Sequence, residues 1–134
     1  MEILHKSNYY EILFDQSKSL IVHKALNGSS EMSDQEFKQE MHLFLEMCEK
    51  YSPERDLVHL VDMNYPIVPD IQEWVNNEIF PRLLIVVKRM ALVMPSEMVA
   101  ELAIEQTMEE EEGKKFVSRY FSDENQALEW LIML

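Results

Sequence analysis

Residues 57–61 form a short apolar run interrupted only by a histidine, and Asp62 closes the run. A strand with one face in water alternates apolar and polar residues, whereas this run offers no polar face. Strands of this kind are typical of parallel sheets that helices cover on both sides. The run therefore predicts an α/β fold in which this strand is buried and does not lie at an edge.

The rest of the chain alternates between strand-like and helix-like segments. Two aromatic and β-branched segments joined by four turn-forming residues predict an antiparallel hairpin near the N-terminus. The predicted strands cover residues 8–14, 19–25, 57–61, 89–94 and 116–121, and the predicted helices begin near Ser33, Asp70, Ser96 and Asp123. We expect residues 1–134 to form one domain of α/β or mixed α+β class, with one mixed five-stranded sheet and four helices in the order β-β-α-β-α-β-α-β-α. The last helix should pack on the sheet through Trp130 and Leu131.

Several residues carry local signals for helix ends. Ser33 and Glu36 have the spacing of a capping box, so a helix should begin directly after Ser33. Pro81 falls inside an apolar helical pattern and should kink or end that helix. Residues 83–87 are compatible with a helix or a strand. Gly113 is expected to close the third helix with a positive φ.

Composition excludes several classes of function. The net charge of −13 leaves little basic surface for nucleic acid or anionic lipid, so neither is an expected partner. With two glycines, 85 positions apart, the chain contains neither a P-loop nor a dinucleotide-binding motif, and we expect no cofactor. The single Cys48 fits a reducing compartment, and no apolar stretch approaches the about 20 residues of a membrane span. We expect a cytoplasmic protein.

Three segments of the second half resemble a known family. The family is that of SpoIIAA-like, or STAS-like, bacterial domains. Its second helix resembles Trp74 with residues 79–84, and its fourth strand resembles residues 88–95. Its closing strand and helix resemble residues 120–131. The resemblance implies a mixed sheet and a role in protein–protein regulation without catalysis. Some relatives of this shape bind apolar ligands in a manner compared with CRAL-TRIO lipid carriers.

The chain departs from this family at the exit of the third predicted strand. Sigma-regulating members carry a phosphorylatable serine there, whereas Asp62 is followed by Met63, Asn64 and Tyr65. We therefore expect a binding module that phosphorylation between Asp62 and Asp70 does not control. The candidate ligand or partner surface comprises Asp62, Met63, Asn64, Tyr65, Trp74 and Arg89.

Other residues admit both a structural and a functional interpretation. His59 could act as a general base near Asp62 and Arg89, although a structural histidine is the favoured interpretation. Cys48 shares an apolar helix face and is expected in the core, and the spacing of His5, His23 and His42 does not indicate a metal site. The run of residues 109–112, four glutamates, fits a solvated helix end or a docking site for a basic partner. The chain contains ten methionines, which fill either an ordinary core or an adaptable apolar pocket. Those distributed over the predicted elements are Met41, Met47, Met63, Met90, Met94, Met98 and Met108.

Two classes of function remain. The favoured one is a non-enzymatic regulatory or interaction module with a protein partner, and its alternative within binding proteins is a carrier of a small apolar ligand. The other class is a small enzyme with a site in the loops after the third and fourth predicted strands, where open parallel sheets bind ligands. We also expect a homodimer, because the hairpin with Tyr9 and Tyr10 should form an open sheet edge.

Overall fold

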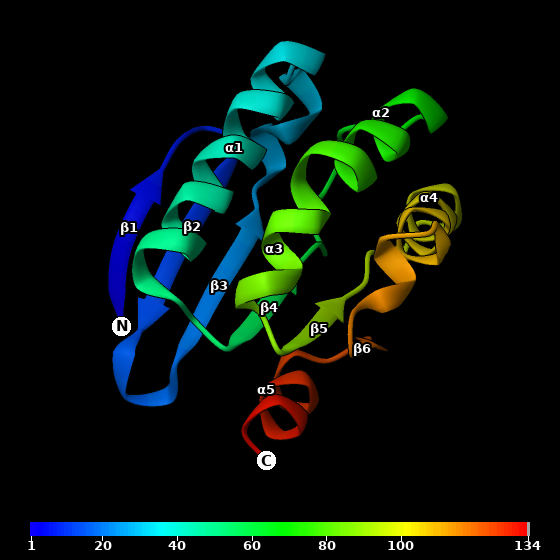
Figure 1. Cartoon of the computed structure of the whole chain (residues 1–134). Helices are drawn as coiled ribbons and strands as arrows, with labels where there is room; N and C mark the ends of the chain where they lie inside the picture. The colour runs from blue at the N-terminus through cyan, green and yellow to red at the C-terminus, as the bar shows by residue number, and fades with distance from the viewer. Residues whose placement is uncertain (134) are drawn as a thin grey trace.

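The computed structural model describes residues 1–133, and these residues form one mixed sheet of six strands (Figure 1). The strands lie in chain order across the sheet, with β1 to β3 antiparallel and β3 to β6 parallel. They are β1 (Glu2–Lys6), β2 (Tyr10–Asp15), β3 (Leu20–Ala25), β4 (Arg55–His59), β5 (Arg89–Val93) and β6 (Ser118–Phe121). The predicted α/β class, single mixed sheet and antiparallel hairpin are confirmed.

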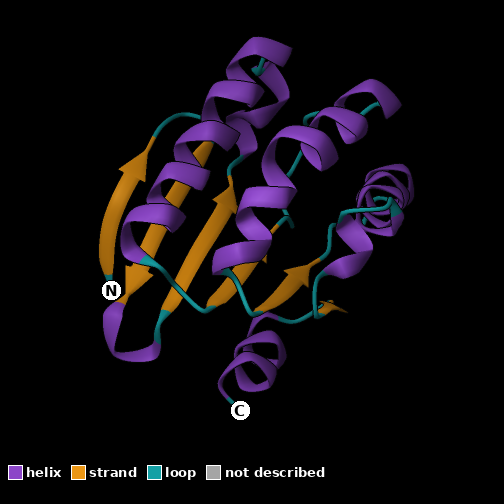
Figure 2. Cartoon of the chain, in the orientation of Figure 1, coloured by secondary structure: helices purple, strands orange, loops and turns teal. Residues whose placement is uncertain are grey.

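Helices cover the sheet on both faces (Figure 2). One face is covered by α1 (Asp34–Tyr51), by α4 (Met98–Glu109) and by a continuous helical segment between them in the chain. This segment consists of α2 (Pro69–Trp74), the π-helical turn η3 (Val75–Ile79) and α3 (Phe80–Val86). The opposite face is covered by α5 (Glu124–Ile132). Short 3-10 turns complete the described chain at η1 (Gln16–Lys18), η2 (Asn27–Glu31) and η4 (Gly113–Lys115). With α2, η3 and α3 taken as one helix, the four predicted helices are present.

The prediction of five strands is wrong, because β1 adds a sixth. β1 pairs with β2 and is exposed or half-buried along its whole length, so its sequence lacks the apolar signal of a core strand. β1 pairs along the outer edge of β2, and Tyr10 on β2 is only 2% exposed. The hairpin therefore does not form the open edge that was expected, and β1 and β6 are the two edges of the sheet.

The central position of β4 agrees with the apolar run that predicted it. β4 lies between β3 and β5, and its side chains alternate between two cores. Leu57 is fully buried on the α5 side, together with Leu131 and with Trp130 beside them. The predicted packing of the last helix is thus confirmed, and residues 56, 58 and 60 face the opposite, larger layer of helices.

The helix that contains Pro81 neither ends nor breaks there. A π-helical turn from Val75 to Ile79 directly precedes α3, and Pro81 occupies its first turn, where a missing N–H is tolerated. Inside this turn Asn76 is buried and donates from Nδ2 to the carbonyl oxygens of Gln72 and Thr107. Residues 83–86 continue as helix, which resolves the ambiguity of the sequence.

Gly113 does not adopt the positive φ that was predicted, and α4 ends before it, at Glu109. The backbone amide of Gly113 donates to Oδ1 of Asn76 at 2.8 Å. A Cβ atom at this position would lie 2.5 Å from the carbonyl oxygen of Thr107 and 2.8 Å from Cα of Met108. Close backbone approach, and not left-handed geometry, therefore explains the glycine.

We predict that Gly113→Ala lowers the free energy of unfolding by about 1–3 kcal/mol, because the added methyl group overlaps backbone that cannot move aside cheaply. The adjacent exposed Lys114→Ala should change it by less than about 0.5 kcal/mol. Urea denaturation of the three proteins measures both values. Equal stability of Gly113→Ala and the parent chain would contradict this account of the close approach.

Candidate functional site

A cavity of about 80 Å³ lies between the sheet and the helices α1, α3 and α4. Strands β2 to β5 form its floor, and aromatic and aliphatic side chains from the helices form its roof. A space of about 10–15 Å³ already holds a water molecule, whereas a 150 Å³ apolar cavity holds benzene. The cavity is therefore large enough for a small molecule or several waters.

Three polar side chains, Tyr10, His23 and Asp56, form a diagonal row across the floor. The strand registers place Tyr10 opposite Ala25, and Asp56 opposite Ile21, so that both flank the position of His23 on β3. All three side chains line the cavity and are buried. Each comes from a different strand, so the pairing of β2, β3 and β4 fixes their relative positions.

Asp56 is fully buried, and neither of its carboxyl oxygens has a hydrogen-bond partner among residues 1–133. Burial raises its pKa from 3.8 to about 8, because an ionised carboxylate is disfavoured away from water. Burial therefore favours the protonated, uncharged form of Asp56 at neutral pH. A polar group left unpaired in this way costs about 1–3 kcal/mol, a cost that ordered water or a ligand in the cavity would offset.

His23 is held between two aromatic rings. Its imidazole stacks on Phe44 with centroids 4.0 Å apart and on Tyr10 with centroids 4.5 Å apart. Burial, with a smaller effect from His5, lowers its pKa from 6.5 to about 3, so the ring is neutral. Within the described residues its Nε2 atom has no hydrogen-bond partner. The stacking fixes the plane of the ring and thus the direction of this nitrogen.

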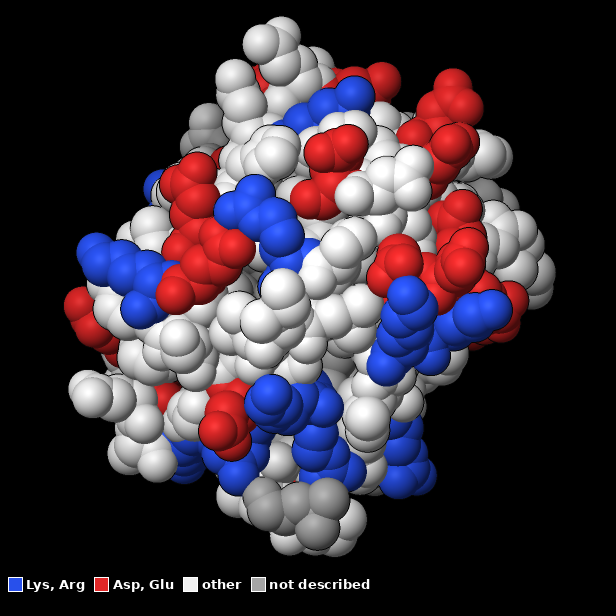
Figure 3. Space-filling model, in the orientation of Figure 1, with Lys and Arg blue, Asp and Glu red and all other residues white. Residues whose placement is uncertain are grey.

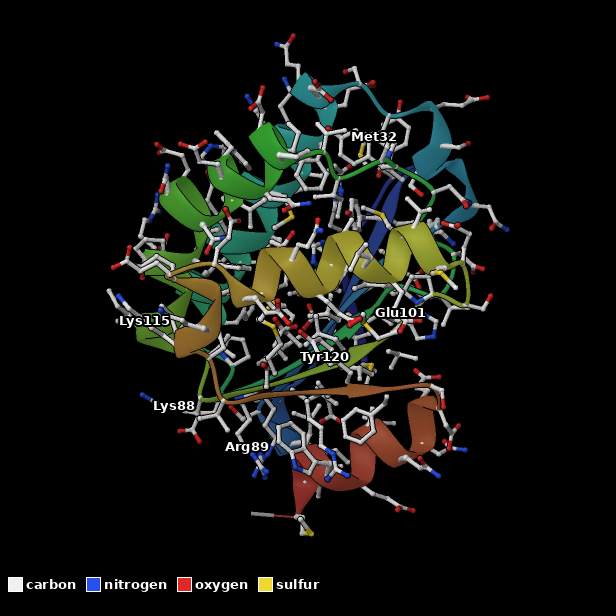
Figure 4. The ribbon with its side chains drawn as sticks, turned by 90° about the vertical axis from the view of Figure 1, so that its right-hand side faces the viewer. Met32, Lys88, Arg89, Glu101, Lys115 and Tyr120 are labelled. Atoms are coloured by element: carbon white, nitrogen blue, oxygen red, sulfur yellow. The ribbon has the colours of Figure 1, made fainter. Side chains whose placement is uncertain are left out.

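Methionine side chains form a flexible part of the cavity wall. Four methionines contribute, namely Met41, Met63, Met90 and Met108. Several side-chain sulfur atoms are visible in the layer between α4 and the strands (Figure 4). The sulfur of Met63 accepts a weak hydrogen bond from the Tyr10 hydroxyl at 3.7 Å. Because methionine adapts to irregular shapes, the cavity can change its shape at modest cost.

A second hollow of about 180 Å³ lies at the surface, between the loop after β4 and the first turns of α4. Met63, Ile67 and Ile104 line both this groove and the inner cavity, so these three side chains separate the two spaces. The groove is at the carboxyl ends of β4 and β5, where open parallel sheets bind ligands. Through these three shared side chains the groove borders the cavity that contains the row of polar groups.

Side-chain contacts fix the loop that borders the groove. The Tyr65 hydroxyl donates to Asp34 at the start of α1, and its ring stacks on Phe37 at 4.7 Å. Burial and the bond to Asp34 raise the pKa of this hydroxyl above its usual value. On the opposite side, the Glu97 carboxylate accepts from the amides of Val99 and Ala100 and so caps α4.

The structure brings four of the six predicted surface residues together. Met63, Asn64 and Tyr65 line the groove, and Asp62 directly precedes them. Trp74 lies beyond Phe37, with its ring edge-on to Phe37 and to His42.

Arg89 is at the opposite end of the sheet, because it begins β5 (Figure 4). There it stacks on Trp130 and donates to the carbonyl oxygen of Trp130 at the end of α5.

The other candidate residues do not form a catalytic group. His59 lies on the α5 side of β4, and its register partner on β5 is Val93, four residues from Arg89. Cys48 is fully buried, and burial raises the pKa of its thiol, as expected for a core cysteine. In residues 1–133 no group of three His, Cys, Asp or Glu side chains could hold a metal ion. No helix of this part of the chain has the length and apolar character needed to cross a membrane.

Sequence reasoning missed Asp56 and considered His23 only as a metal ligand. Asp56 directly precedes the apolar run and has the same parity as Val58 and Leu60, which both face the cavity. A charged residue in phase with the buried positions of a central strand was the available signal.

Comparisons with protein-family models, curated proteins and solved structures find no match to this chain.

The two buried titratable groups predict an unusual dependence of stability on pH. Between about pH 4 and 6.5, the folded state binds a proton on Asp56 that the unfolded chain has lost, and the unfolded chain binds a proton on His23 that the folded state lacks. The two states therefore bind the same number of protons at these groups, and their stability does not change with pH in this range. Between pH 6.5 and about 8 only Asp56 differs, and the folded state binds the extra proton. Stability should therefore fall by about 1.4 kcal/mol per pH unit in this window.

Urea denaturation at pH 6.5 and pH 8 measures this fall. Asp56→Asn should abolish it, because an amide does not titrate, whereas the exposed Asp70→Asn should retain it. A parent chain equally stable at both pH values would contradict the burial of an unpaired carboxyl group.

A second prediction concerns the cost of that group. Asp56→Leu should raise the free energy of unfolding at pH 7 by about 1–3 kcal/mol, because it removes an unpaired polar group and fills part of the cavity. Asp56→Ala removes the same group and leaves a larger void, so its gain should be smaller. Loss of stability in the leucine variant would show that Asp56 has a stabilising partner.

Proposed function

We propose that this chain is a non-enzymatic binding module that takes a small, largely apolar molecule into the cavity beneath α1, α3 and α4. The observation that carries the proposal is the apolar space beneath the helices with two unpartnered polar groups, Asp56 and His23, among the described residues. Core packing normally leaves neither a void of this size nor buried polar atoms without partners. Both are accounted for when a ligand occupies the cavity.

Binding is a better interpretation than catalysis. The polar groups on the cavity floor are held neutral, and the Thr107 hydroxyl already donates to the Ala103 carbonyl oxygen within α4. The Cys48 thiol does not belong to the cavity wall. The lining, as far as the structure describes it, therefore offers no activated nucleophile beside a base.

A regulatory role with a protein partner fits the same surface. Met98, Val99 and Leu102 are exposed apolar residues on α4, and Val99 also lines the groove. A partner that contacts this side of α4 would touch the entrance to the cavity. This arrangement, with the resemblance to STAS-like domains, supports a cytoplasmic module whose partner binding responds to a ligand rather than to phosphorylation of residues 62–70. The homodimer expected from the sequence remains a prediction.

The charge distribution supports small-molecule and protein partners over nucleic acid. On the face shown in Figure 3, Asp and Glu side chains alternate with Lys and Arg side chains over the upper part, and further Lys and Arg side chains gather toward the lower rim. A net charge of −13 disfavours close approach of phosphate groups at the groove.

Benzene is a suitable first probe, because it is apolar and its entry requires the flexible methionine wall to expand the cavity from about 80 Å³ toward about 150 Å³. In protein with ¹³C-labelled methionine methyl groups, we expect benzene to shift the signals of Met41, Met63, Met90 and Met108. The exposed Met98 and Met133 serve as internal controls. Absence of shifts confined to the lining methionines would contradict the proposal.

Val58→Phe should block these shifts by filling the cavity from β4. Val61→Phe adds the same bulk at an exposed position and should leave them intact. Circular dichroism establishes that both variants remain folded.

A further inference from the structure

We infer that the ligand is an uncharged alcohol whose hydroxyl group lies between Asp56 and His23, with its hydrocarbon chain directed toward Met63 and the groove. The inference rests on the proposed function and defines the chemical class of the molecule that the cavity takes.

The first argument is the hydrogen-bonding capacity of the floor. Both carboxyl oxygens of Asp56 and Nε2 of His23 lack a partner within residues 1–133. A protonated carboxyl group offers one donor and an acceptor, and a neutral imidazole nitrogen is either a donor or an acceptor. A hydroxyl group offers one donor and two acceptor positions, so it can pair with both residues in either tautomer of His23. An ether or a ketone only accepts, so it leaves His23 unpaired whenever Nε2 carries no proton, whereas a hydroxyl group pairs in both tautomers.

The second argument is charge. The described lining of the cavity contains no lysine or arginine, so the carboxylate of a fatty acid would have no counter-ion there. An ammonium group would have to ionise Asp56 inside an apolar space, where both ions lose their hydration. An uncharged polar group avoids both costs. The site therefore selects against acids and amines with the same hydrocarbon chain.

The third argument is shape. The inner cavity of about 80 Å³ is roughly half the 150 Å³ that holds benzene, so it accommodates the polar end and only a few carbon atoms. A longer chain can extend toward Met63, Ile67 and Ile104, which also line the groove of about 180 Å³. Movement of the unbranched Met63 side chain joins the two spaces. A linear chain of medium length fits this path better than a branched or fused-ring molecule.

Four probes of similar size and different polar groups test the inference: 1-hexanol, pentyl methyl ether, hexanoate and hexylamine. Each is titrated into the full chain at pH 7, and the shifts of the lining methionine methyl groups give the dissociation constant. We expect 1-hexanol to bind at least tenfold more tightly than each of the other three. Equal binding of all four would overturn the inference and leave the proposed function intact, whereas binding of none, with no response to benzene, would overturn both.

Preferential binding of hexylamine would also overturn it, in favour of an ion pair with Asp56. Variants then locate the selectivity. Asp56→Asn retains a donor and an acceptor in a side chain of the same shape. The ratio of the dissociation constants of the ether and 1-hexanol should therefore stay within threefold of its value in the parent chain. Asp56→Leu should remove that preference. Because the comparison of the four probes uses the parent chain, a variant that fails to fold leaves the test decisive.

Discussion

The carboxyl group of Asp56 is fixed in place by the burial of β4 on both faces. β4 lies between β3 and β5, and its register places Asp56 between Ile21 and Met90. Because α5 occupies one side of the sheet and three helical segments occupy the other, the strand cannot turn this side chain toward solvent. The raised pKa of Asp56 and the absence of a hydrogen-bond partner for its carboxyl group within residues 1–133 follow from this one constraint.

Much of the layered architecture could be predicted because its signals are local. The apolar run of residues 57–61 indicated a buried strand, and the capping box at Ser33 and Glu36 is present as expected. β1 was missed because an exposed edge strand needs no apolar pattern; its pairing with β2 supplies the stability. The π-helical turn before Pro81 was also beyond reach, because it depends on contacts of Asn76 with α4 and Gly113.

The candidate site was predictable only at its entrance. Asp62, Met63, Asn64 and Tyr65 follow a strand end, and this position in a parallel sheet indicates a ligand groove. Arg89 was grouped with them although it begins its strand, and parallel strands begin at the edge opposite to the one at which they end. Asp56 was hidden for a different reason. A single charged residue before an apolar run is usually a loop residue, so its phase with Val58 and Leu60 was a weak signal that the strand register then confirmed.

Met63 connects the interior of the site to its surface. Its sulfur accepts from the Tyr10 hydroxyl, and its side chain lines both the cavity and the groove. A chain that passes from one space to the other must displace this side chain and so break the contact with Tyr10. The displaced residue belongs to the loop that carries Asn64 and Tyr65, and Tyr65 is bonded to α1 through Asp34. Under the proposed function, a ligand in the cavity would therefore reach the surface loop of residues 63–65 through one side chain.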